Sequence, residues 1–198
     1  MNSSRFLVFL AVWAVVATVA GALHLFLHLP PVGVQGVIVL VSLSFSVALA
    51  RVSWLRSGAE ALPVKAILAF HLTRFVGIWF LWLYAQGRMP AEFAQRAGWG
   101  DIAAAVGAMV LLVWPMGRGF WRALVVWNVL AAVDLFVAVG TAGWLNRTRP
   151  GSMIELAVLP LALIPLFLVP VLIGSHFVLL RRGAGKAFGA QRVAASSL

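Results

Sequence analysis

Six long stretches of apolar residues, separated by short polar connections, constrain this chain more than any other feature. We place them at residues 6–29, 34–50, 63–84, 101–115, 120–145 and 153–180. Each is long enough, or nearly so, for a helix to cross about 30 Å of hydrocarbon. A helix satisfies its own backbone hydrogen bonds in lipid, and the stretches lack the sustained two-residue alternation of barrel strands. The sequence therefore predicts an all-α membrane protein, a polytopic bundle of six transmembrane helices.

The composition supports lipid as the solvent for much of this surface. The 198 residues are 63% hydrophobic and 10% charged, whereas a soluble domain is nearer half apolar and a quarter charged. We expect one transmembrane domain over residues 1–182 and a flexible basic cytoplasmic tail over residues 183–198. The chain has no cysteine, which excludes disulfides, thiolate metal sites and cysteine nucleophiles.

The basic residues predict the orientation. The chain has fifteen Lys and Arg but only five Asp and Glu, which gives a net charge of +10. Because they lie between the apolar stretches and in the tail, we interpret them as topology signals that contact anionic lipid headgroups, not nucleic acid. With the N-terminus inside, the inner set is Arg5, Arg51, Arg56, Lys65, Arg118, Arg122, Arg181, Arg182, Lys186 and Arg192, and the outer set is Arg88, Arg96, Arg147 and Arg149. Both termini are therefore expected in the cytoplasm.

Arg74 interrupts the third stretch close to its centre. It lies about 16 Å along that helix from Pro63 at roughly 1.5 Å per residue, where an unpaired Arg costs at least about 2.5–3.5 kcal/mol. Asp134, about 18 Å along the fifth helix from Arg122, lies at similar depth and is the one carboxylate expected there. Asp101 is expected at a helix N-terminus, which favours an anion. The matched depths predict an Arg74–Asp134 ion pair.

Two roles for this pair remain open. It could fix which helices touch, or it could line a cavity for an anionic substrate, a proton or a quinone-like headgroup. His71 lies one turn from Arg74 on the same helix face, and Asn128 could add a hydrogen bond between helices. The leading hypothesis is a protein that handles a small solute or a proton at an Arg74–Asp134–His71 site. The first alternative is a non-catalytic subunit or assembly factor of a larger membrane complex.

The histidines suggest a second alternative, a haem- or metal-binding membrane protein. His24 and His28 are four residues apart, which would place both on one face of the first helix and suit a metal ion, with Glu92 or Asp101 as a third ligand. His71 and His176 have compatible depths for ligating a haem b. No cofactor is part of the leading hypothesis.

The sequence carries no enzyme signature that we recognise. It lacks G-x-S-x-G, H-E-x-x-H and the Walker A loop, so no catalytic residue is assigned and a protein without enzymatic activity is favoured. Pro160, Pro165 and Pro170 recur every five residues in the sixth stretch. Each removes a backbone N–H, which predicts a bent helix packed against protein.

Three segments resemble a group of small bacterial integral membrane proteins of unknown activity. They are "YAQGRMPAEFAQRAGWGDIAAAVGA", "WNVLAAVDLFVAV" and "LPLALIPLFLVPVLIGSHF", and the likeness runs from the third stretch to the sixth. The resemblance implies a multi-pass protein of the bacterial cytoplasmic (inner) membrane. It assigns no substrate and leaves open a homo-oligomer or a larger complex in the lipid bilayer.

Overall fold

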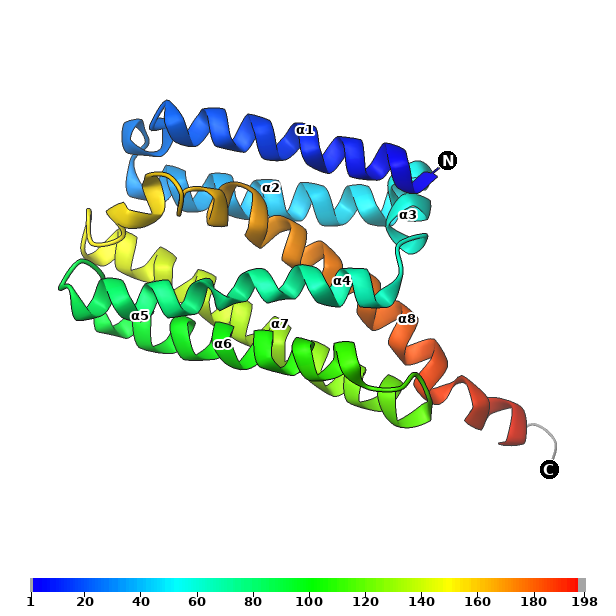
Figure 1. Cartoon of the computed structure of the whole chain (residues 1–198). Coiled ribbons are helices and arrows are strands. Elements are labelled where there is room, and N and C mark those ends of the chain that lie inside the picture. The colour runs from blue at the N-terminus through cyan, green and yellow to red at the C-terminus, as the bar shows by residue number, and fades with distance from the viewer. Residues whose placement is uncertain (1, 196–198) are drawn as a thin grey trace.

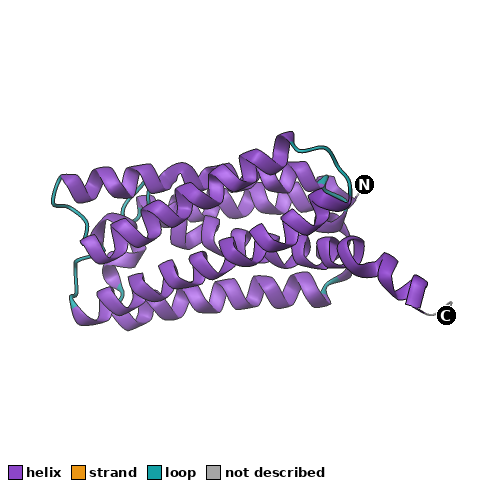
Figure 2. Ribbon diagram, turned by 90° about the horizontal axis from the view of Figure 1, so that it is seen from below, coloured by secondary structure: helices purple, strands orange, loops and turns teal. Residues whose placement is uncertain are grey.

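The computed structural model describes residues 2–195, and within that range the chain is helical with turns between the helices (Figure 2). The first part contains α1 (Asn2–Ala22), the 3₁₀ helix η1 (Leu25–His28), α2 (Pro31–Arg51) and α3 (Ser53–Glu60). The middle contains α4 (Val64–Phe70), the 3₁₀ helix η2 (His71–Val76), α5 (Gly77–Ala85) and α6 (Ala91–Val113). The last part contains α7 (Arg118–Thr148), the 3₁₀ helix η3 (Ile154–Ala157), the π-helical turn η4 (Ile164–Leu168) and α8 (Val169–Ala195).

Six helices among these residues are long and apolar enough to cross a membrane. They cover Ser3–Ala22, Val32–Arg51, Val64–Ala85, Ala91–Val113, Arg118–Thr148 and Ile164–Ala187. The predicted all-helical architecture with six such helices is therefore confirmed. Large apolar side chains remain exposed along these helices; on α1 they include Val8, Val12, Val15, Val16 and Val19.

The long helices run roughly along one common axis (Figure 1). Phe9 and Trp13 of α1 contact the Phe45 ring of α2, and the short α3 packs against both helices. The α4–η2–α5 rod packs along α6, which in turn packs on α7. Helix α8 packs on both α7 and α2 and so joins the two groups. Both chain ends lie at the same end of the bundle in the two views (Figures 1 and 2).

Two predicted boundaries at the start and end of the chain were wrong. The first helix ends at Ala22, not at residue 29, and His24 adopts a left-handed backbone conformation with φ 53° before η1 begins. At the other end, α8 continues to Ala195. The described part of the predicted flexible tail is therefore helical, and residues 196–198 lie outside the described range.

The sixth stretch is not one bent helix from residue 153 to 180. A 3₁₀ turn and a loop precede η4, and regular α-helix begins only at Val169. The prolines supply the physical reason, because each lacks the N–H that an α-helix would use. Pro165 lies inside the π-helical turn, and both Pro165 and Pro170 are buried, while Pro160 is exposed. The expected packing against protein thus holds for the two prolines within the helix.

Candidate functional site: a buried charged centre

Arg74 lies where the third apolar stretch changes from an α-helix to a 3₁₀ helix. The predicted single helix over residues 63–84 consists of α4, η2 and α5, and Arg74 belongs to η2. In a 3₁₀ helix, residues three apart lie on the same side, so His71 and Arg74 share one side of η2. Both side chains are fully buried, at 0% and 1% exposure.

The Arg74 guanidinium is surrounded by oxygen acceptors from two other helices. Its Nε donates to Oδ1 of Asp101 at 2.6 Å, and its Nη1 donates to the Ala131 carbonyl at 2.9 Å. Its Nη2 donates to Oδ2 of Asp134. The ion pair expected between Arg74 and Asp134 is thus present, and both carboxylates bond to one cation.

The second carboxylate, Asp101, is a correction to the sequence analysis. Asp101 was expected at a helix N-terminus, but α6 begins ten residues earlier, at Ala91. Asp101 therefore lies in mid-helix, and its side chain is only 10% exposed. The signal was present in the sequence, because Pro90 immediately precedes α6 and proline favours the first turn of a helix. The segment "AEFAQRAGWG", expected within the connection that precedes Asp101, is the first part of the same helix.

Glycines allow the backbones around this centre to come close. A Cβ at Gly100 on α6 would overlap the Asp134 carboxylate, and a Cβ at Gly77 would overlap the Gly98 carbonyl oxygen. Gly77 is the first residue after η2. The absence of side chains at these positions therefore lets α6 approach the 3₁₀ segment and lets Asp134 reach Arg74.

Two buried histidines lie beside the guanidinium. His71 Nε2 bonds to Ser175 Oγ at 3.0 Å, and His176 Nδ1 bonds to Asn128 Oδ1 at 2.9 Å. The Asn128 amide also donates to the His176 carbonyl at 3.0 Å. Asn128 therefore does bond across helices, and its partner is His176 on α8. The Trp127 ring packs edge-on against His71, with ring centroids 5.0 Å apart.

The packing of the two imidazoles does not fit a haem held between them. Their ring centroids are 4.6 Å apart. Two metal–nitrogen bonds of about 2 Å each would place the ligating nitrogens about 4 Å apart and the ring centroids further still. We therefore derive no step through a haem at His71 and His176.

The other histidine pair does not share a helix face. His24 and His28 follow α1, and both are exposed. The expected third ligands are engaged elsewhere: Asp101 bonds Arg74, and Glu92 bonds Arg149. Among residues 2–195, no group of three His, Asp or Glu side chains is close enough to hold a metal ion.

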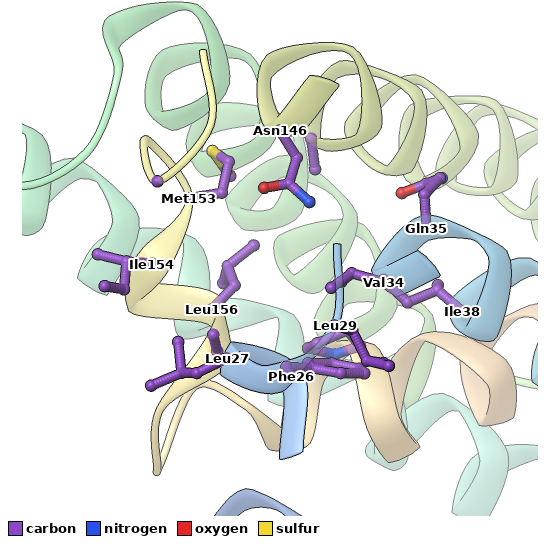
Figure 3. Close-up of a pocket in the computed structure, with 14 residues that line it drawn as sticks. Phe26, Leu27, Leu29, Val34, Gln35, Ile38, Asn146, Met153, Ile154 and Leu156 are labelled. Atoms are coloured by element: carbon purple, nitrogen blue, oxygen red, sulfur yellow. The ribbon is translucent and has the colours of Figure 1, made fainter. Parts of the chain in front are cut away.

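Two cavities lead toward the charged centre from the end of the bundle opposite to the termini. The outer one has a volume of about 200 Å³ and is lined by residues that include Gln35, Asn146 and Met153 (Figure 3). A smaller one of about 60 Å³ shares Gln35 with it and is also lined by Asp101. A third cavity of about 310 Å³ is largely apolar and reaches Ser175. Asp101 and the Ser175 partner of His71 thus line two separate cavities.

These features define an all-helical protein whose bundle encloses one guanidinium, two carboxylates and two imidazoles. The chain belongs to the family described as a domain of unknown function (DUF8737), whose model matches residues 31–182. The matched region begins at α2 and extends into α8, so it contains every member of the charged centre. No curated protein and no solved structure matches the chain.

Proposed function

We propose that this chain is an integral membrane protein that binds and moves a proton at the Arg74–Asp101–Asp134 centre. One observation carries the proposal: a single buried cation faces two carboxylates. Arg is effectively always protonated, so with both carboxylates ionised the three side chains sum to one negative charge. An uncompensated charge in a low-dielectric interior is costly. Uptake of one cation at this centre makes it neutral.

A proton suits this centre better than a metal cation. Protonation needs only one carboxylate oxygen, whereas Mg²⁺ or Ca²⁺ takes about six or more oxygen ligands. The anionic substrate considered from the sequence is disfavoured, because the two carboxylates already occupy the guanidinium. The Asp134 side chain is 25% exposed and that of Asp101 lines a cavity. The cavity at Asp101 gives a proton a way to reach the centre, and Asp134 shares that proton through their common bonds to Arg74.

The proposed setting is the cytoplasmic membrane of a bacterium, with both termini in the cytoplasm. The six apolar helices support insertion, and the ten-to-four distribution of basic residues supports the orientation. An even number of crossings fits two chain ends at one end of the bundle (Figure 1). The exposed apolar side chains of α1 and α2 would then face lipid or a partner subunit.

The test is proton flux through purified protein in lipid vesicles that contain a pH-sensitive dye. A potassium diffusion potential drives protons inward, and the wild-type protein is expected to acidify the lumen faster than protein-free vesicles do. Asp101→Asn and Asp134→Asn each leave a neutral one-to-one pair with Arg74, so each should reduce the flux to background. Glu92→Gln is the matched control, since Glu92 is an exposed, ion-paired carboxylate on the same helix as Asp101.

Wild-type flux equal to that of protein-free vesicles would contradict the proposal. Constant copurification with fixed partner proteins, together with absent flux, would instead support the subunit alternative. Flux that persists in both Asn variants would place proton movement elsewhere in the molecule.

A further inference from the structure

The hydrogen bonds of His71 determine which of its nitrogens carries the hydrogen. Ser175 Oγ donates its single hydrogen to the Leu172 carbonyl at 2.7 Å. The same oxygen lies 3.0 Å from His71 Nε2, so there it accepts, and Nε2 must carry the hydrogen. In a neutral imidazole the other nitrogen then bears a lone pair. That nitrogen, Nδ1 of His71, is buried and has no hydrogen-bond partner.

The same reasoning applies to His176. The Asn128 amide nitrogen must face the His176 carbonyl, to which it donates at 3.0 Å. The amide oxygen therefore faces His176 Nδ1, which donates to it at 2.9 Å. The remaining nitrogen, Nε2 of His176, thus bears the lone pair, and it too is buried without a partner. The fold holds both imidazoles as neutral bases with a bare lone pair each.

The two bases are neighbours and lie beside the buried Arg74 guanidinium, to which both carboxylates bond. Their rings pack with centroids 4.6 Å apart, and both pack against Trp127. The ionisable groups on the surrounding elements that lie inside the bundle are Arg74 on η2, Asp101 on α6 and the part-buried Asp134 on α7. The remaining ionisable side chains that the structure describes on α6, α7 and α8 lie toward the helix ends and are exposed or, for Arg182, half-buried: Glu92, Arg96, Arg118, Arg122, Arg147, Arg181, Arg182 and Lys186. The helices α4, α5 and α2 also contribute Lys65, Tyr84 and Arg51, which are exposed near the helix ends. The three inner groups sum to one negative charge when both carboxylates are ionised.

We propose that His71 and His176 form a second proton-binding site, which takes up one proton between them and exchanges it with the Asp101–Asp134 carboxylates. The inference rests on the proposed function and deepens it. One proton on the pair makes the whole buried set neutral. A second proton would place two adjacent imidazolium rings in a buried site, which like-charge repulsion opposes. The capacity of the pair is therefore one proton. Ser175 lines the apolar cavity, and its hydroxyl group links that cavity to the pair through His71.

The experiment is nitrogen NMR of the full chain in lipid nanodiscs with ¹⁵N-labelled histidine. The chain has four histidines, and the exposed His24 and His28 are assigned by His24→Asn and His28→Asn. At high pH we expect the Nε2–H tautomer for His71 and the Nδ1–H tautomer for His176. On acidification, both buried rings should change in one common step that corresponds to one proton, while His24 and His28 titrate separately.

A proton count gives the second measurement. In a background lacking His24 and His28, the change His71→Gln with His176→Gln should lower the protons taken up on acidification by one. Asn128→Leu removes only the hydrogen-bond partner of His176 Nδ1. The hydrogen of His176 should then no longer be fixed on Nδ1, whereas the hydrogen of His71 should stay on Nε2.

Two results would overturn the inference. One is separate titration of the two buried rings with two protons. The other is unchanged ring signals over the whole pH range in which the protein stays folded, with proton uptake confined to the carboxyl infrared band. The second result would leave the proposed function standing. If the two imidazoles share one proton but the vesicles show no proton flux, the proposed function fails and the shared site stands.

Discussion

At the scale of the residue, the ratio of one cation to two anions decides how the centre responds to substitution. A one-to-one pair, as the sequence suggests, would make Arg74 and Asp134 equally important to stability. In the structure, loss of Arg74 leaves two carboxylates without a cation, whereas loss of either carboxylate leaves a neutral pair. The energetic consequences are therefore asymmetric.

We predict that Arg74→Met lowers the free energy of unfolding by about 3–5 kcal/mol, because it leaves buried charge uncompensated. Asp101→Asn should cost about 1.5–3 kcal/mol, the usual value of a hydrogen bond to a charged group. Chemical unfolding in detergent micelles measures both. The triple variant with Met at position 74 and Leu at positions 101 and 134 should recover part of the loss. Equal costs for the two single changes would show that the second carboxylate carries no charge.

At the scale of the element, the 3₁₀ segment η2 positions the site. A continuous α-helix over residues 63–84 would turn His71 and Arg74 about 60° away from each other at 3.6 residues per turn, while the 3₁₀ winding aligns them. No residue in "HLTRFVGI" requires a 3₁₀ helix by its own backbone preference. The 3₁₀ winding occurs where Gly77 meets Gly98 on α6, so the winding and the helix contact belong together.

Gly77→Ala tests this contact. Its new methyl group would overlap the Gly98 carbonyl oxygen, and forced overpacking typically costs about 1–3 kcal/mol. We expect a loss of that size in unfolding free energy, together with weaker proton flux, since α6 carries Asp101. Gly36→Ala on α2 is the matched control, because a Cβ there meets nothing within 4 Å. If Gly77→Ala is as harmless as Gly36→Ala, close backbone approach is not what holds η2 in place.

The elements also show what could be predicted from the sequence and what could not. Apolar runs located all six long helices, and depth counting paired Arg74 with Asp134, because both depend on length and rise per residue alone. Asp101 was misplaced because the polar composition of "AEFAQRAGWG" favours a connection between two helices, whereas the segment is the first part of α6. The bonds of His71 to Ser175 and of His176 to Asn128 join residues about 50 to 100 positions apart. Such pairings depend on how helices pack, which periodicity does not encode.

At the scale of the whole molecule, the position of both chain ends is a topology prediction. With both termini cytoplasmic, a reporter that is active only in the cytoplasm should work when fused to the C-terminus. A reporter that is active only outside should work when inserted in the turn between α5 and α6, near Arg88. The reverse pattern of activity would refute the orientation and the interpretation of the basic residues.

The wide separation of the charged partners along the chain has a consequence for biosynthesis. Asp101 follows Arg74 by 27 residues and Asp134 follows it by 60. At a synthesis rate of about 5–20 residues per second, Asp134 leaves the ribosome roughly 3–12 s after Arg74. During that interval the newly made α4–η2–α5 segment carries a guanidinium that lipid disfavours by at least about 2.5–3.5 kcal/mol. The segment is therefore expected to wait at the insertion machinery and to enter the bilayer as a group with α6 and α7, once its anions have been made.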